Sequence, residues 1–119
     1  MSLQEELDRV MGAVRLIAPR LDVILSIDTS TPEVMREAAH AGAGLLNDVR
    51  AFSRDGAMGA AVASQLPVSL MHMSDEPDRM QEQTKYVDVV TDVKAFLAHR
   101  IAACREAGCL LYTSDAADE

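Results

Sequence analysis

Three short apolar runs in this chain each end in a polar residue, and a helix-like stretch follows each run. Strands that alternate with helices predict a parallel sheet, and parallel sheets bind ligands at the carboxyl ends of their strands. We therefore expect the polar residues to lie beside one another at one mouth of the sheet. The runs and the residues that follow them are Val23–Ile27 with Asp28, Gly44–Leu46 with Asn47 and Asp48, and Pro67–Met71 with His72.

Asp28 and Asn47 combine side chains that suit one kind of ligand. A carboxylate only accepts hydrogen bonds, whereas an amide both donates and accepts, so the pair fits a flat nitrogen heterocycle whose edge carries both kinds of group. The alternative for Asp28 is a helix cap, but Ser30 and Thr31 already fill that role and leave Asp28 free. Acids at the ends of α/β barrel strands are usually site residues, so we favour a ligand role.

The neighbouring residues Asn47 and Asp48 have two interpretations. In a turn motif, each side chain bonds its own backbone. In a site motif, one side chain faces the mouth of the sheet and the other faces the neighbouring loop. Both interpretations stay open from the residues alone.

His72 lies between Met71 and Met73, where an imidazole suits a general base, although a structural histidine held by a backbone carbonyl is more common. The methionines suit packing or the wall of a flat aromatic pocket. Cys104 and Cys109 lack a second pair of ligands and make no disulfide framework. We interpret them as buried or incidental thiols.

The composition indicates one globular domain. Hydrophobic residues make up 49% of the 119 residues and charged residues 25%, which is globular rather than disordered. A formal net charge of −8 disfavours nucleic acid, and with 3% aromatic residues and no tryptophan there is no platform for base stacking. No apolar stretch reaches the length of a membrane span and no charged-then-apolar leader opens the chain, so we expect a cytoplasmic protein.

Helical periodicity and capping signals place helices between the apolar runs. The run Val23–Ile27 itself is almost continuously apolar, which is typical of a strand covered on both faces. The predicted helices extend from a capping box at Ser2–Glu5 to Pro19, from Thr31 to Gly42, over Asp55–Gln65, and along the apolar stripe from Val89 to Ile101.

Read together, these segments resemble dihydropteroate synthase. Any one motif would be weak, but four in order at matching spacing are a strong signal, and the likeness covers about Ser2 to Gly108. The resembling motifs are residues 27–34, 44–50 and 67–73, and a fourth, supporting segment that contains residues 80–82 and 86–90.

The resemblance implies a partial (β/α)8 TIM barrel, covering about strands 3 to 5 with flanking helices, in an α/β fold. On this fold we expect four apolar strand side chains to face the barrel interior. They are Ile24, Leu45, Leu46 and Leu70.

The resemblance also implies a transferase of folate biosynthesis. Enzymes of this family join (7,8-dihydropterin-6-yl)methyl diphosphate to p-aminobenzoate and release diphosphate with help from Mg²⁺. Asp28 and Asn47 would bind the pterin, and Met71 and Val49 would be apolar walls of the same pocket. The protein ligand of Mg²⁺ and the groups that hold diphosphate and p-aminobenzoate lie outside this chain, so no catalytic residue is assigned and the chain alone is predicted to be inactive. The expected partners are these small molecules, and a homodimer is an option for the full-length protein.

Residues 1–108 are predicted to form the partial pterin-binding barrel domain. Residues 109–119 resemble nothing in the family, and we interpret them as a spurious tail.

Two alternatives to the function of dihydropteroate synthase remain. One is a corrinoid-dependent methyltetrahydrofolate methyltransferase, which has a related pterin barrel, although the run Leu70–Met73 argues against it. The other is a pterin-binding module without catalysis.

Overall fold

Helices and strands alternate along the chain, as the sequence predicts. The computed structural model describes residues 1–72 and 88–111, so the resembling segment 80–82 and residues 86 and 87 lie outside the described residues. The elements are α1 (Leu3–Ile17), β1 (Ser26–Asp28), α2 (Pro32–His40), β2 (Leu45–Asp48), α3 (Ala57–Ser64), β3 (Pro67–Leu70), α4 (Val89–Ala107) and β4 (Leu110–Leu111).

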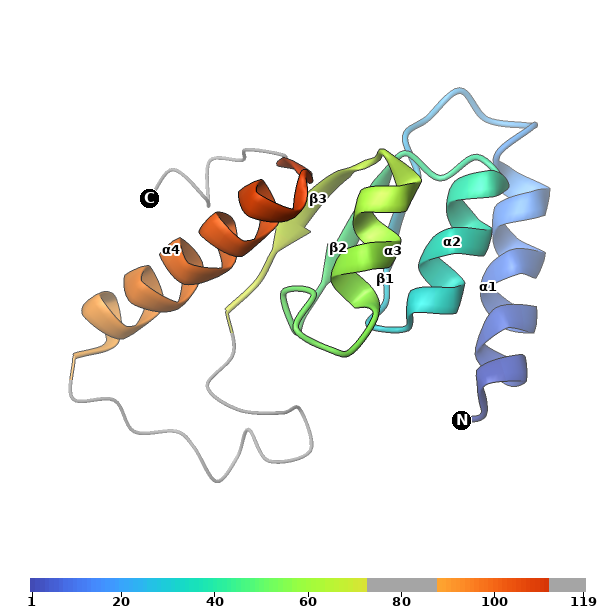
Figure 1. Cartoon of the computed structure of the whole chain (residues 1–119). Helices are drawn as coiled ribbons and strands as arrows, with labels where there is room; N and C mark the ends of the chain where they lie inside the picture. The colour runs from blue at the N-terminus through green and yellow to red at the C-terminus, as the bar shows by residue number, and fades with distance from the viewer. Residues whose placement is uncertain (73–87, 112–119) are drawn as a thin grey trace.

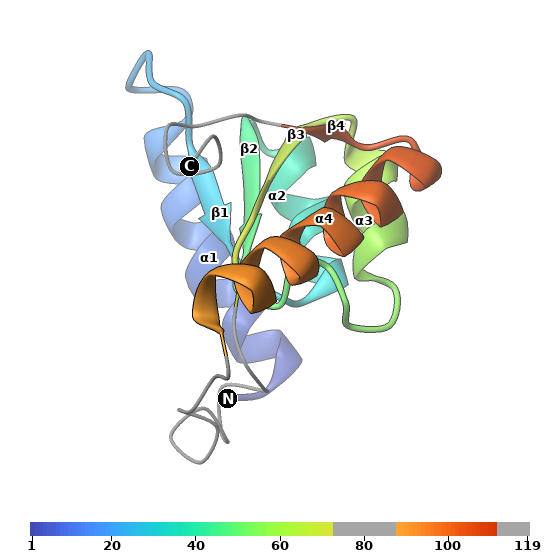
Figure 2. The ribbon, with the colours of Figure 1, turned by 90° about the vertical axis from the view of Figure 1, so that its left-hand side faces the viewer.

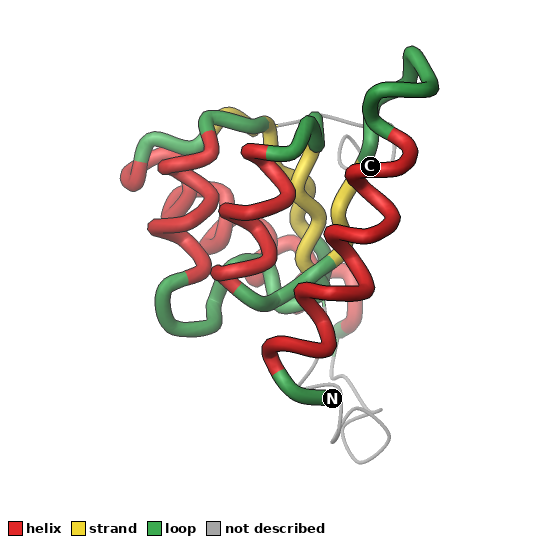
Figure 3. Tube along the Cα trace, turned by 90° about the vertical axis from the view of Figure 1, so that its right-hand side faces the viewer, coloured by secondary structure: helices red, strands yellow, loops and turns green. Residues whose placement is uncertain are grey.

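The strands form one parallel sheet in the order β1-β2-β3-β4 (Figures 1 and 2). Helix α2 packs between α1 and α3, and α4 contacts α3, β3 and β4. Figure 3 shows the row of helices from the side where α1 lies. The sequence-based prediction of a parallel α/β fold is confirmed.

The helices cover one face of the sheet, and the strand residues alternate accordingly. Ile27, Leu46 and Val68 are buried beneath the helices, whereas Ser26 and Asp28 on the opposite face are exposed. This alternation follows from the two-residue period of a strand. It divides the sheet into a core face and an open face, and the polar strand-end residues are distributed between the two.

Local signals set the helix bounds. The Ser2 hydroxyl accepts a hydrogen bond from the Glu5 amide at 3.1 Å and caps α1, whose apolar stripe buries Met11 and Val14. Pro32 begins α2, and the chain turns out of that helix at Gly42 with φ of 115°, a conformation that favours glycine. The predicted ends of these two helices are confirmed.

Two expectations about the apolar strand residues are wrong. The run Val23–Ile27 is not a strand covered on both faces: β1 comprises only Ser26–Asp28, and Ile24 is 81% exposed. Leu46 and Leu70 do not face the open side, because they alternate with Asn47 and Ser69 and so share the helix-covered face with Val68. The first expectation fails because β1 pairs with β2 only over Ser26–Asp28. The second fails because of the pleat, since a consecutive pair such as Leu45 and Leu46 cannot face the same way.

Candidate functional site

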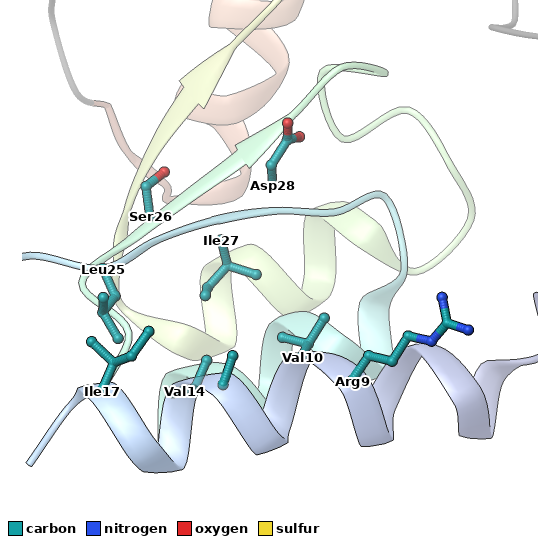
Figure 4. Close-up of a pocket in the computed structure, with 9 residues that line it drawn as sticks. Arg9, Val10, Val14, Ile17, Leu25, Ser26, Ile27 and Asp28 are labelled. Atoms are coloured by element: carbon teal, nitrogen blue, oxygen red, sulfur yellow. The ribbon is translucent and has the colours of Figure 1, made fainter.

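Asp28, Asn47 and Ser69 form a row across the sheet. Asp28 is the register partner of Asn47 on β2, and Asn47 is the partner of Ser69 on β3. Paired residues on neighbouring strands point to the same face, so all three side chains lie on the open face. Figure 4 shows Asp28 and Ser26 pointing away from α1, whereas Leu25 and Ile27 point toward it. Asp28 and Asn47 therefore lie side by side, as the sequence predicts, and Ser69 extends the row.

The side chain of Asn47 is poised to accept a hydrogen bond. Within residues 1–72 and 88–111, its Oδ1 is the one buried side-chain polar atom without a hydrogen-bond partner. The Asp28 carboxylate next to it is exposed on the same face. An unpaired buried oxygen beside an exposed carboxylate offers acceptors to the donor groups on the edge of a heterocycle.

Asp48 takes the opposite role on the other face. It is fully buried, and its carboxylate accepts hydrogen bonds from the Ser30 hydroxyl, from the Arg50 amide at 2.9 Å and from the Phe52 amide at 3.0 Å. Both interpretations of the Asn47-Asp48 pair hold in part: the two side chains take opposite faces, and Asp48 also bonds the backbone that follows it, as in the turn motif. Asn47 takes the mouth and Asp48 the loop.

The loop that Asp48 holds contains two residues in the left-handed region. Ala51 has φ of 52° and Phe52 has φ of 60°, a conformation that costs an L-residue roughly 1–2 kcal/mol. Phe52 is nonetheless the largest fully buried side chain of the described residues. The hydrogen bonds that the Asp48 carboxylate accepts from the Arg50 and Phe52 amides hold the backbone in this strained shape, which places Phe52 in the core.

The hydroxyls of Ser30 and Thr31 do not cap α2. Thr31 occupies the N-cap position without a side-chain hydrogen bond to the helix, and its hydroxyl donates to Glu6 at 2.8 Å. Ser30 donates to Asp48. The argument that these hydroxyls leave Asp28 free by capping the helix is therefore wrong, although Asp28 itself is not the cap. Loop residues that point into the protein meet partners on other elements, and sequence spacing does not reveal those partners.

The remaining candidates lie around the row. Met71 follows β3 and is 39% exposed, and Val49 is half-buried in the turn after β2. Their assignment as pocket walls stays a prediction. The His72 ring packs edge-on against Phe96 of α4, with ring centroids 5.0 Å apart, which favours the structural interpretation of this histidine.

A cavity of about 380 Å³ lies between α1 and β1 (Figure 4). Apolar side chains from both elements make up most of its wall, and Asp28 stands at its edge with the carboxylate turned away. The cavity lies on the α1 side of β1. It is therefore distinct from the open face on which Asp28 and Asn47 meet.

The described ranges contain no group of three or more His, Cys, Asp or Glu side chains that could hold a metal ion, and no helix long and apolar enough to cross a membrane. Cys104 and Cys109 are free thiols, and burial raises the pKa of Cys104 to about 12. Their interpretation as buried or incidental thiols agrees with this environment, since Cys104 is buried and Cys109 is half-buried.

A sequence model of the family described as pterin binding enzyme matches residues 1–111. This chain belongs to that family. The dihydropteroate synthase of Escherichia coli K12 is 49% identical over 107 residues, which are 90% of this chain and 38% of that protein. The Haemophilus influenzae dihydropteroate synthase is 46% identical over 107 residues and is covered to 39%.

Solved structures give the same picture. The Yersinia pestis dihydropteroate synthase with a sulfonamide drug complex matches with a TM-score of 0.88 and 49% identity, covering 91% of this chain and 39% of that one. The Stenotrophomonas maltophilia dihydropteroate synthase with active site-bound imidazole also gives 0.88, at 47% identity, covering 92% of this chain and 41% of that one. The resemblance and the partial (β/α)8 barrel are confirmed, and the chain spans about two fifths of the length of these relatives. The family match ends at residue 111; the domain boundary at Gly108 stays a prediction.

Proposed function

We propose that this chain is the central segment of a dihydropteroate synthase and that Asp28 and Asn47 bind the pterin substrate. The observation that carries the proposal is the row on the open face, where the unpaired Oδ1 of Asn47 lies next to the exposed carboxylate of Asp28. The reaction joins (7,8-dihydropterin-6-yl)methyl diphosphate to p-aminobenzoate in folate biosynthesis and releases diphosphate. Names of similar proteins support this reaction over methyl transfer, because the matched relatives are dihydropteroate synthases.

The chemistry of the two side chains fits the edge of a pterin. That edge carries ring N–H and amino donors next to an imine acceptor. The Asp28 carboxylate accepts from the donors, and the Asn47 amide accepts through Oδ1 and donates through its NH₂ group. A site built in this way rejects analogues that leave its polar groups unpaired. In this proposal the segment recognises and orients one substrate, with Met71 and Val49 as apolar walls.

Mg²⁺ belongs to the proposed reaction as the ion that assists departure of diphosphate. The described residues do not fit a metal site, since they bring together no suitable ligand group, and we assign none of them a step through the ion. A cytoplasmic location and a homodimeric full-length protein are further parts of the proposal that rest on the resemblance alone.

A chimera tests the proposal. The segment replaces the matching part of the Escherichia coli dihydropteroate synthase, to which it is 49% identical, and calorimetry measures binding of 6-hydroxymethylpterin. Asp28→Asn turns an acceptor into a donor that faces the donors of the ligand. We expect a loss on the order of 1–3 kcal/mol in pterin binding, the penalty for an unpaired buried group, with the KM for p-aminobenzoate unchanged.

Asp22→Asn is the matched control, because Asp22 is an exposed aspartate just before the same strand. The control should bind pterin as the parent chimera does. Unchanged pterin affinity in the Asp28→Asn chimera would remove Asp28 from the site.

A further inference from the structure

Glu6 of α1 connects to the loop that follows Asp28. Its Oε2 accepts a hydrogen bond from the Thr29 hydroxyl and its Oε1 accepts one from the Thr31 hydroxyl, each at 2.8 Å. The Thr31 amide in turn donates to the Thr29 hydroxyl oxygen at 3.1 Å. One carboxylate from a helix therefore holds both ends of the short β1–α2 turn.

Asp48 connects the same turn to the next one. It accepts from the Ser30 hydroxyl in the β1–α2 turn and from the amides of Arg50 and Phe52 in the β2–α3 loop. The turn of residues 29–31 is thus bonded to two carboxylates. Thr29 and Thr31 donate to Glu6, and Ser30 donates to Asp48.

Buried polar groups in the described residues concentrate here. The buried polar and charged side chains of those residues are Thr29, Ser30 and Asp48, and all three belong to this network. Burying such groups is costly unless each one is hydrogen-bonded, so a set of them in one place marks a region whose shape is closely specified.

The network lies directly behind the pterin residues. Asp28 immediately precedes Thr29, and Asn47 immediately precedes Asp48. The Thr29 amide also donates to the Asn47 carbonyl oxygen at 3.0 Å, which ties the two strand ends together. Because consecutive strand residues point to opposite faces, fixing Thr29 and Asp48 on the helix side fixes the direction of Asp28 and Asn47 on the open side.

We propose that Glu6 and Asp48 are positioning residues that aim Asp28 and Asn47 at the pterin without touching it. The proposal rests on the pterin-binding function proposed above. Glu6 acts through the hydroxyls of Thr29 and Thr31, and Asp48 acts through Ser30 and the β2–α3 loop.

The test uses the whole 119-residue chain in solution, isotopically labelled for NMR. Amide hydrogen exchange at Thr31, Arg50 and Phe52 reports on the network, and titration with 6-hydroxymethylpterin gives the dissociation constant from resonances of the site. Glu6→Ala removes both acceptors of the turn. We expect faster exchange at Thr31 and a dissociation constant raised about tenfold, the scale seen when supporting groups behind a site are lost.

Two companion variants identify the cause. Glu6→Gln should keep most of the affinity, because its amide oxygen accepts from one threonine hydroxyl and its NH₂ group donates to the other. Glu5→Ala is the matched control, since Glu5 is the exposed neighbour on the same helix, and it should bind as the unmodified chain does.

The Asp48 arm is tested through Ser30→Ala. Asp48→Asn would place an NH₂ group against a backbone N–H in the core and risks unfolding. Ser30→Ala leaves in place the Arg50 and Phe52 amides that donate to Asp48. We expect Ser30→Ala to weaken pterin binding and to leave exchange at Phe52 slow.

Each outcome either supports or overturns the positioning role of Glu6 and Asp48. Weaker pterin binding by folded Glu6→Ala and Ser30→Ala, with affinity restored in Glu6→Gln, supports the proposal. If these variants melt at a lower temperature but bind pterin as tightly as the unmodified chain, the network is structural only and the positioning role is overturned. If neither the unmodified chain nor the chimera described above binds pterin, the proposed function of the segment fails, and the positioning role with it. If only the chimera binds pterin, the same variants are compared in the chimera with the same criteria.

Discussion

The direction in which Asp28 points depends on the pleat of β1, and a pair of isoleucines tests that pleat. Ile24 and Ile27 belong to one apolar run, yet Ile27 is 8% exposed beneath α1 and Ile24 is 81% exposed. If the strand slipped by one residue, Ile27 would leave the core and Asp28 would turn toward the helices. The comparison of Ile27→Ala with Ile24→Ala therefore reports on the site as well as on the core.

The expected magnitude follows from burial. Ile→Ala deletes three carbon atoms, and at about 0.8 kcal/mol per buried CH₂ group the transfer contribution for Ile27 is about 2.4 kcal/mol. The cavity contribution is small because Ile27 already borders the cavity of about 380 Å³ next to α1, so we expect a total of about 2–4 kcal/mol. Ile24→Ala removes atoms that are already in water and should change the free energy of unfolding by less than about 0.5 kcal/mol.

Urea titration of the 119-residue chain, followed by circular dichroism at the helical band, measures the difference. With a slope of roughly 1–3 kcal/mol per molar urea, Ile27→Ala should lower the midpoint by about 1 M or more, and Ile24→Ala should leave it in place. If Ile24→Ala shifted the midpoint as far as Ile27→Ala, the pleat described here would be refuted, together with the placement of Asp28 on the open face.

Three further predictions follow from single groups. Burial raises the pKa of Cys104 to about 12 and also raises that of the half-buried Cys109. Iodoacetamide at pH 8 should therefore modify Cys109 first and Cys104 only after unfolding in urea. Equal rates of modification in the folded chain would contradict this. Hydrogen bonds from Thr91 lower the pKa of Asp88, the N-cap of α4. The contribution of Asp88 to the stability of α4 is therefore complete above its unfolded pKa of about 4 and is lost as pH falls through its lower folded pKa. Asp88→Asn should flatten the acid dependence of the Thr91 amide chemical shift measured by NMR. The 119-residue chain alone should incorporate no labelled p-aminobenzoate into dihydropteroate, because under the proposed function Asp28 and Asn47 would orient only one of the two reactants; turnover above a blank would argue against this.

Local chemistry made the helix ends predictable. Ser2 and Pro32 mark helix starts through capping and fixed φ, and Gly42 marks an end through its positive φ. The start of β1 was not predictable in the same way. An apolar run shows which residues prefer burial, but pairing with Leu45–Asn47 decides that the strand comprises Ser26–Asp28.

Some residues of the candidate site were likewise predictable from the sequence, and others were not. Asp28 and Asn47 could be found from sequence because strand ends in a parallel sheet converge at one edge. The side on which Asp48 lies follows from alternation once Leu46 is known to be buried. No sequence pattern indicates that Glu6 contacts the β1–α2 turn. It is separated from Thr29 by 23 positions, and only the packing of α1 beside β1 brings the two residues together.

Neighbouring residues on β2 show opposite hydrogen-bonding states, and the contrast indicates where a ligand belongs. The Asp48 carboxylate accepts from a hydroxyl and two amides of the protein, whereas the Asn47 Oδ1 is buried and accepts from no group of the described residues. An oxygen left in this state costs about 1–3 kcal/mol, and a hydrogen-bond donor on a bound molecule would recover that energy. A fold selected for stability alone would gain from an apolar side chain at this position. The unpaired Oδ1 of Asn47, next to an exposed Asp28 on the same face, therefore supports the proposal that a bound ligand supplies the missing donor.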